Sequence, residues 1–234
     1  MVSKEGFLII DKPPGITSFG VIYALRKMTG IKKIGHAGTL DPLATGILIC
    51  AIGRSATKKI DLFLKKDKSY IAEIELGATS STYDADGEIT RRDEVKDPGR
   101  KSVEKATEYF VGTILQSPPA FSAKKINGVR AYQLARLGME VKLKQQKVNI
   151  KQIKIVHYDF PKLVIEVDCG SGTYIRSLAN DIGEKLKIGG YITSLRRIRS
   201  ERFIIDQAIN MSHLTKDNWE DFIFPIETFI EDAV

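Results

Sequence analysis

The sequence lacks the features that mark several classes of protein. It has two cysteines, Cys50 and Cys169, each alone in an apolar segment, so we expect buried thiols and no disulfide or thiolate metal site. Three widely separated histidines give no support to a zinc site. The longest apolar run, 47–52, falls far short of the roughly 20 residues that span a bilayer. Because the apolar residues 6–10 lead directly into Asp11-Lys-Pro-Pro, without the pattern of a signal peptide, we expect a cytoplasmic protein with no membrane span.

The composition fits a globular protein with a polyanionic partner. The chain has 234 residues, of which 43% are apolar, enough for one large domain or two small ones. Lys and Arg number 36 against 29 Asp and Glu, which gives a net charge of +7. Such an excess is typical of proteins that bind nucleic acid, although solvated lysines also produce it.

Hydrophobic periodicity predicts a mixture of strands and helices, without repeats or a linker that marks a domain boundary. Thr17 or Ser18 is a suitable N-cap for a first helix that ends at Gly30. Further helices are expected at 55–64, 101–111, 129–137 and 174–186. Strands are expected at 7–10, 47–52, 70–76, 151–157, 162–169, 190–198 and 201–205. The end of the chain, 211–234, is expected to form a helical, acidic tail.

Residues 30–46 are rich in glycine and poor in apolar side chains, so we expect an irregular loop. Loops of this kind often carry function. Asp41 precedes Pro42, whose ring restricts the preceding residue to an extended conformation. The glycines on both sides would let the chain turn sharply and let a planar ligand approach. Taken alone, the pattern fits either a structural Asp-Pro turn or a carboxylate held for chemistry.

Seven short motifs occur in a fixed order along the chain. Asp11-Lys-Pro-Pro-Gly-Ile-Thr-Ser18 and Gly35-His-Ala-Gly-Thr-Leu-Asp-Pro-Leu-Ala-Thr-Gly46 come first. Five more follow, at 68–72, 81–87, 118–123, 170–176 and 195–197. Together they resemble the TruB family of tRNA pseudouridine synthases, whose opening reads DKPxGxTS and whose catalytic segment reads GHxGTLDPxAxG. The resemblance is to the bacterial type, with a short C-terminal region.

This resemblance implies a fold and an activity. The expected fold is α+β, with a mixed, largely antiparallel central sheet and flanking helices. The expected reaction isomerises a uridine to pseudouridine in the T loop of tRNA, at position 55, with Asp41 as the catalytic carboxylate. Because no atom enters or leaves overall, we expect no cofactor and no metal. Asp41 would attack the sugar, attack the base or remove a sugar proton, and the sequence does not choose among these routes.

The resemblance also assigns roles around Asp41. Arg176 would pair with the catalytic carboxylate, favouring its ionised form and fixing its orientation. Tyr70 would stack on the uracil and place a hydroxyl near the reacting atoms. Leu195 would form an apolar wall of the pocket. Without the motifs, the arginine fits a helix start or a phosphate contact, and the other two fit a packed core.

Contacts to the RNA are expected from several other residues. His36 would enter the RNA loop when the target base is extruded, which costs about a few kcal/mol. Lys12 and Pro13 would support the catalytic loop or the pocket. A basic arm at 121–147 would contact phosphates through Lys124, Lys125, Arg130, Arg136, Lys142 and Lys144. A second basic region comprises Arg196, Arg197, Arg199 and Arg202, of which Arg197 is a candidate RNA contact.

The expected domain organisation is a catalytic domain at 1–205, including the arm, and a short tail or remnant of an RNA-binding module at 206–234. Because some 30 residues cannot form a PUA domain, we expect no guide-RNA particle. The expected partner is the T stem-loop of tRNA, bound by a monomer.

Two other functions remain open. One is a catalytically inactive RNA-binding or RNA-folding factor with the same fold, which the joint presence of Asp41, Tyr70 and Arg176 disfavours. The other is a small-molecule enzyme with a phosphate loop at Gly170-Ser-Gly-Thr173. That segment lacks the lysine of a P-loop and the third glycine of a dinucleotide fingerprint.

Overall fold

The computed structural model describes residues 4–122, 124–126, 128–139, 141 and 143–229. The chain forms two compact units: unit 1 contains Met1–Tyr70 and Arg196–Val234, and unit 2 contains Ile71–Leu195. Both boundaries fall inside strands, β4 (Lys68–Leu76) and β12 (Gly190–Ser200). The predicted catalytic domain, 1–205, takes in all of unit 2 and part of unit 1, and its boundary at 205 stays a prediction.

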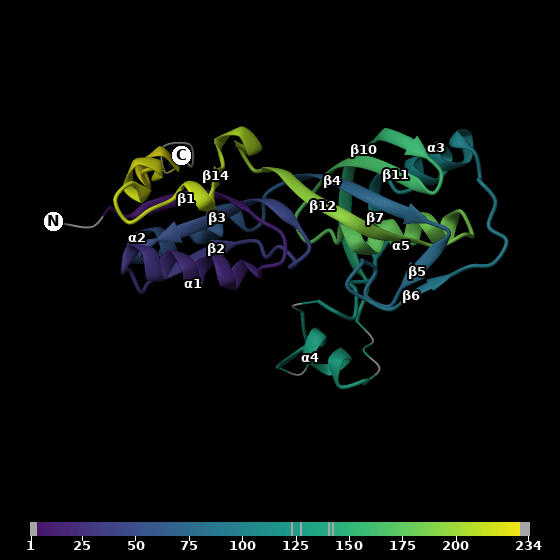
Figure 1. Ribbon diagram of the computed structural model, residues 1–234, viewed down its shortest axis with the longest axis horizontal. Helices are drawn as coiled ribbons and strands as arrows, with labels where there is room; N and C mark the ends of the chain where they lie inside the picture. The colour runs from purple at the N-terminus through teal and green to yellow at the C-terminus, as the bar shows by residue number, and fades with distance from the viewer. Residues whose placement is uncertain (1–3, 123, 127, 140, 142, 230–234) are drawn as a thin grey trace. The chain divides into compact units, whose positions relative to one another are not determined.

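Strand β3 (Thr45–Ile52) is the centre of unit 1 (Figure 1). It pairs along one edge, antiparallel, with β1 (Gly6–Lys12). Its other edge is shared between β2 (Ile34–Ala37), which is antiparallel, and the last part of β12, which is parallel. Because β3 has neighbours on both sides, its apolar run is entirely buried, as the uninterrupted hydrophobic pattern predicts.

Unit 1 contains two further short strands and three helical segments that precede β4. Their bounds are β13 (Phe203–Ile204), β14 (Ile209–Asn210), α1 (Ser18–Thr29), α2 (Gly53–Lys58) and the 3₁₀ turn η1 (Ile60–Phe63). Helix α1 begins and ends where its sequence predicts. The Thr17 hydroxyl accepts a hydrogen bond from the Gly20 N–H at 2.9 Å, and Gly30 closes the helix with φ of 73°.

The C-terminal residues belong to the core of unit 1. Phe7 and Phe224 exchange two backbone hydrogen bonds of 2.9 Å. The ring centre of Phe229 lies 5.2 Å from that of Phe7, edge to face. The ring centre of Phe63 lies 4.8 Å from that of Phe7 and belongs to the same aromatic cluster. The predicted helical tail, 211–234, instead has 3₁₀ turns in its described residues: η3 (Met211–His213), η4 (Trp219–Phe222) and η5 (Glu227–Phe229). Another turn, η2 (Ile205–Gln207), precedes it.

The strands of unit 2 follow the order β12-β4-β11-β10-β7, and β12 and β4 each continue into unit 1. Strands β10 (Gln146–Asp159) and β11 (Lys162–Cys169) form a long antiparallel hairpin, and β7 (Gly112–Gln116) pairs antiparallel with β10. Alternate residues of β11 are buried, including Leu163, Ile165 and Val167, which is the period-2 pattern of the sequence. The predicted α+β class with a mixed, largely antiparallel sheet is confirmed.

The rest of unit 2 surrounds this sheet. Its elements are the hairpin β5 (Ala78–Ser80) with β6 (Ile89–Arg91), and helices α3 (Arg100–Glu108) and α5 (Ile175–Lys185). Residues of the expected arm form β8 (Lys125–Ile126), β9 (Val129–Arg130) and α4 (Ala131–Arg136), which stand off the main sheet (Figure 1). Their role in RNA binding stays a prediction.

Three further observations bear on the sequence analysis. Both cysteines are buried free thiols, as predicted, and burial raises the pKa of Cys50. Within the described part of the chain, no helix has the length and apolar character needed to cross a bilayer. The expected loop at 30–46 contains strand β2, which the sequence analysis missed because Gly35 and His36 interrupt any apolar alternation.

We expect Gly46→Ala to destabilise the protein by about 3 kcal/mol or more. Gly46 has φ of 94°, and a Cβ there would lie 2.2 Å from the backbone oxygen of Arg197 on β12. The control is Gly15→Ala, where φ is also positive, at 82°, but no heavy atom lies within 4 Å. Only backbone strain of about 1 kcal/mol is expected there. Urea unfolding measures both, and equal losses would contradict the steric argument.

Candidate active site

Asp41 lies in unit 1 on the connection between β2 and β3. Its backbone oxygen accepts a hydrogen bond from the Ala44 N–H at 3.1 Å, which closes a turn through Pro42. The preceding residue, Leu40, is buried, and its N–H and carbonyl bond to the Ser18 hydroxyl at 2.8 and 3.0 Å. The start of α1 therefore fixes the backbone next to the carboxylate.

Lys12 supports the same turn through hydrogen bonds from its side chain. Its side chain is fully buried at the end of β1, and its Nζ donates to the carbonyls of Pro13, Ile16 and Pro42 at 2.9, 2.7 and 3.2 Å. The Pro42 carbonyl also accepts from the Gly15 N–H at 2.9 Å. The first motif and the Asp41 motif are thus joined through the residue after Asp41. This geometry agrees with the supporting role predicted for Lys12 and Pro13.

The charge of Lys12 is poorly hydrated in this position. Burial lowers the pKa of Lys12 to about 8, and the negative charge of Asp41 opposes that shift. An ammonium group beside Asp41 would favour the ionised carboxylate in return.

Arg197 closes the loop at its two ends. Its side chain is only 1% exposed, and its guanidinium donates from Nε to the Ile47 carbonyl at 2.6 Å and from Nη2 to the Gly38 carbonyl at 3.0 Å. A guanidinium enclosed in this way has a structural role, and the RNA contact predicted for Arg197 stays a prediction. Its alternation with Arg196 on β12 turns the two side chains to opposite faces.

His36 lies on β2, opposite Cys50 of β3, and is half-buried. Its Nδ1 is buried and has no hydrogen-bond partner among the described residues. Burial lowers the pKa of His36, and the positive charge of Arg197 adds to the effect. Both effects favour the neutral imidazole.

Tyr70 is the last residue of unit 1 before the chain enters unit 2, and Leu195 is the last residue of unit 2 before the chain returns to unit 1. Tyr70 is 8% exposed on β4 and Leu195 is 6% exposed on β12. Such burial suits a ring and an apolar wall that a ligand would cover, and it equally suits packing. The roles predicted for them stay predictions.

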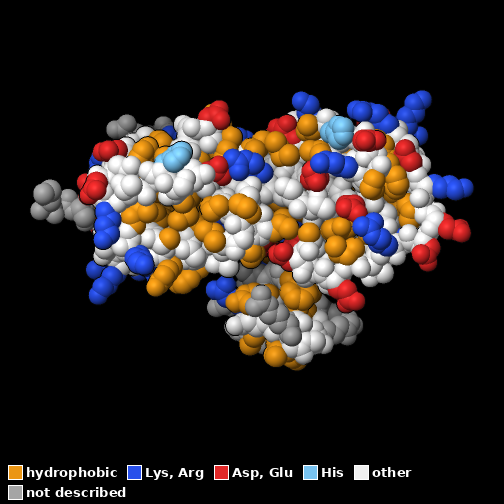
Figure 2. Space-filling model, viewed as in Figure 1, with side chains coloured by type: hydrophobic (Ala, Val, Ile, Leu, Met, Phe, Trp, Pro, Cys, Tyr) orange, Lys and Arg blue, Asp and Glu red, His pale blue; other side chains and the backbone are white. Residues whose placement is uncertain are grey.

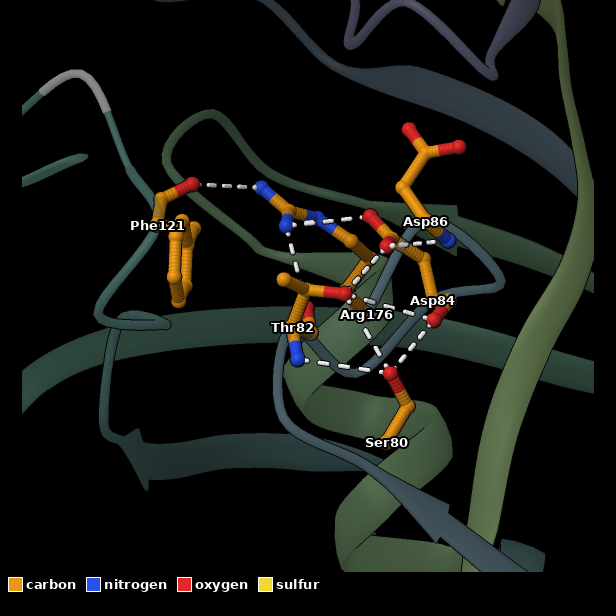
Figure 3. A network of polar contacts seen from close by, with 6 residues as sticks. All are labelled: Ser80, Thr82, Asp84, Asp86, Phe121 and Arg176. Carbon is orange, nitrogen blue, oxygen red and sulfur yellow. Dashed lines mark hydrogen bonds and ion pairs between the residues drawn. The ribbon is translucent and has the colours of Figure 1, made fainter. Parts of the chain in front are cut away.

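Arg176 lies in unit 2, at the second residue of α5, where it is held by a polar network (Figure 3). Its Nη1 is 3.1 Å from Oδ2 of Asp84, and both side chains are buried. The guanidinium also donates to the carbonyls of Thr82 and Phe121 at 3.0 and 2.9 Å. The Asp84 carboxylate accepts in addition from the Thr82 hydroxyl and from the Asp86 N–H. The predicted pairing of Arg176 with Asp41 stays a prediction.

The start of α5 is fixed by a buried side chain that the sequence analysis did not single out. The Gln116 amide accepts from the Tyr174 N–H at 2.9 Å and donates to the Tyr174 carbonyl at 3.0 Å. Ser177 adds a hydrogen bond of 2.8 Å to the Ser117 carbonyl. Asp84 was missed in the same way. Its only signal was its place in the motif 81–87, where it reads as an ordinary turn residue.

Most of the second basic region is engaged inside unit 1. Arg196 forms a bidentate pair with Asp11, at 3.0 and 2.8 Å. Arg199 donates to the Ser69 hydroxyl, and Arg202 pairs with Glu201. These contacts make this region a weaker candidate for RNA binding than its sequence suggests.

The arm is only partly described. Lys124 donates to the side-chain oxygen of Gln146, and Arg130 is exposed at the start of α4. The side chains of Lys125 and Arg136, and Lys142 as a whole, lie outside the described residues. RNA contacts from the arm stay predictions.

Two family models match the chain. The model described as TruB family pseudouridylate synthase (N terminal domain) matches residues 26–175, and the model described as tRNA pseudouridylate synthase B C-terminal domain matches 176–231. Proteins called tRNA pseudouridine synthase B are similar along most of their length. The Chlamydia abortus protein is 47% identical over 88% of this chain and 87% of its own. The Clostridium tetani protein is 40% identical over 95% of this chain and 77% of its own.

Solved structures agree with these matches. A chain of a Cbf5-Nop10-Gar1 complex superposes with a TM-score of 0.75 and 27% identity, over 97% of this chain and 61% of that one. A chain of an archaeal box H/ACA sRNP Nop10-Cbf5 complex gives 0.72 and 25%, also covering 61% of that chain. The fold is that of a pseudouridine synthase. Within that class, the chain belongs to the TruB family, which confirms the resemblance found in the sequence.

We expect the contribution of Lys12 to the free energy of unfolding to increase with pH. Below about pH 8 the lysine is protonated in the folded and unfolded protein alike. Between there and its unfolded value near 10.4 only the unfolded state keeps the proton, so stability rises with pH. Relative to Lys12→Met, the wild-type protein should gain about 3 kcal/mol over this range. Urea unfolding at several pH values tests this, with exposed Lys27→Met as control. A difference that does not change with pH would contradict it.

We expect Asp84→Asn to destabilise the protein by about 3–5 kcal/mol, because it removes the carboxylate paired with a buried guanidinium. The matched control is Glu104→Gln, which breaks the exposed ion pair of Glu104 with Arg100 on α3. A loss below about 1 kcal/mol is expected there. Chemical denaturation measures both, and comparable losses would show that burial of the Arg176 pair is unimportant.

Proposed function

We propose that this protein isomerises a uridine of tRNA to pseudouridine, with Asp41 as the catalytic carboxylate. The observation that carries the proposal is the Asp41 turn, which is fixed by Lys12, Ser18 and Arg197, in a chain of the TruB family. So much internal support for one short loop suits a carboxylate that must keep a defined position.

The reaction needs little besides this group. The bond from C1′ to N1 breaks, the uracil turns, and C1′ bonds to C5; C5 loses a proton and N1 gains one. An ionised carboxylate would attack C1′, attack the base or remove a sugar proton. Each route needs the ionised form, which the neighbouring Lys12 favours.

The other predicted residues complete the proposal. Arg176 would pair with Asp41 and orient it, and Asp84 would hold Arg176 in place. Tyr70 would stack on the extruded uracil, with Leu195 as an apolar wall. A neutral His36 suits insertion among stacked bases better than a charged one, because less hydration is lost.

We further infer that the target is position 55 in the T loop and that the enzyme acts as a cytoplasmic monomer without a guide RNA. Support comes from relatives called tRNA pseudouridine synthase B, which this chain matches over most of their length. A folded loop supplies both the shape and the extrudable base that RNA-binding proteins recognise.

We expect the purified protein to convert the T-loop uridine of an unmodified tRNA transcript without any added cofactor. Carbodiimide mapping detects the product, which has the same mass as uridine. Asp41→Asn should bind the transcript and leave it unconverted, because the amide supports none of the three routes. Thr39→Ser, an exposed change in the same loop, is the control and should retain activity. Full activity of Asp41→Asn would refute the mechanism, and activity on another RNA alone would refute only the substrate.

A further inference from the structure

The excess positive charge of this protein lies in one segment. Residues 12–60 contain eight Lys and Arg but a single acidic residue, Asp41. The rest of the chain has 28 Lys and Arg and 28 Asp and Glu, so residues 12–60 account for the whole net charge of +7. This segment is part of unit 1 and includes neither the arm nor the basic end of β12.

Most of these cations are exposed. Lys12 is buried and Arg26 is half-buried, and the other six are open to solvent: Lys27, Lys32, Lys33, Arg54, Lys58 and Lys59. We call these six residues the basic face. Within the described ranges, no ion pair involves any of them. They differ in this respect from Arg196 and Arg202, which have acidic partners.

The fold brings the basic face together from two stretches of sequence. The Gly53 N–H, at the start of α2, donates to the Lys33 carbonyl at 2.8 Å, beside the paired residues Ile34 and Ile52. Lys32 and Lys33 therefore lie next to Arg54. Figure 2 shows Lys and Arg side chains gathered over α1 and α2. The carboxylate of Glu5 is close, but it accepts from the backbone N–H groups of Arg54 and Ser55.

Two aromatic rings continue this surface along α1. Phe19 and Tyr23, one helical turn apart, are 62% and 66% exposed. The Arg26 guanidinium lies 5.7 Å from the centre of the Phe19 ring. Exposed rings among unpaired cations suit a ligand with flat bases or sugars between its phosphates, and so favour RNA over a featureless anionic surface.

The surface begins beside the active-site loop and leads away from it. Ser18, the first residue of α1, contacts Leu40 next to Asp41. The helix has 12 residues and ends before Lys32. At 1.5 Å per residue its length is about 18 Å, which separates the basic face from Asp41 by several nucleotides of a bound RNA.

We propose that the basic face binds phosphates of the substrate RNA several nucleotides away from the target uridine. The inference rests on the proposed function, since it takes the substrate to be an RNA whose target base lies at Asp41. Each phosphate contact releases condensed counterions, so this surface contributes affinity that falls steeply with salt.

The test compares two triple variants in binding to an unmodified tRNA transcript. K32Q/K33Q/K58Q removes three cations of the basic face. We expect its Kd to rise at least tenfold near 100 mM salt, and the slope of log Kd against log salt to fall by about 2, at roughly 0.7–0.9 per phosphate. Conversion at saturating enzyme should be unchanged, because the Asp41 loop is not altered.

The matched control is K96Q/K101Q/K105Q, three exposed lysines of unit 2 within residues 93–108, which contain five acidic and four basic residues. It should leave both Kd and slope near the wild-type values. A hairpin with the target loop and only three base pairs should bind the wild type and K32Q/K33Q/K58Q equally. Circular dichroism and thermal unfolding establish that both variants are folded.

Three results would overturn the proposal: wild-type Kd and slope in K32Q/K33Q/K58Q, an equal loss in the control, or an equal loss with the short hairpin. Binding to phosphatidylglycerol vesicles that depends on the basic face, with tRNA binding unaffected, would assign the face to a lipid surface instead. Conversion measured in the same samples separates the two hypotheses. If the wild type converts no uridine but the triple variant still binds tRNA less well, the proposed function fails and the RNA-binding surface stands.

Discussion

The guanidinium of Arg197 bonds to the carbonyls of Gly38 and Ile47, and the loop between those carbonyls carries Asp41. Arg197 fits there because the two chain segments nearest to it each have a glycine, which carries no Cβ. Gly46 leaves room for the Arg197 backbone, and a Cβ on Gly38 would lie 3.3 Å from the guanidinium. The pairing of β12 with β3 and the position of the Asp41 turn therefore depend on one buried cation.

Cations serve two different purposes in this protein. Lys12, Arg176 and Arg197 are buried, and each donates to two or three backbone carbonyls. Such cations fix loop geometry. The net charge of the surface comes instead from exposed lysines and arginines, and within residues 12–60 the sole acidic residue is Asp41. One segment thus supplies the carboxylate, two of its supports, Lys12 and Ser18, and the excess positive charge of the chain.

Local signals in the sequence predicted much of the fold. Helix α1 has its cap at Thr17 and its stop at Gly30, and β3 and β11 follow their apolar patterns, because these features depend on neighbours along the chain. Strand β2 was missed, since it exists only through pairing with β3. The tail was predicted to be helical, but aromatic contacts with Phe7 hold it in 3₁₀ turns. The burial of Arg197 was not foreseen, because a charge count carries no information on burial.

The ordered motifs alone determined the family, and with it the expectation that Asp41 is the reacting group, since family patterns record residue identity and spacing. The tertiary structure decided which groups hold that loop and which cations stay exposed. Lys12 meets Pro42 across 30 residues of chain, Arg197 meets Gly38 across 159, and Arg176 meets Thr82 across 94. Contacts at such separations arise from strand pairing and burial, which are properties of the folded chain as a whole.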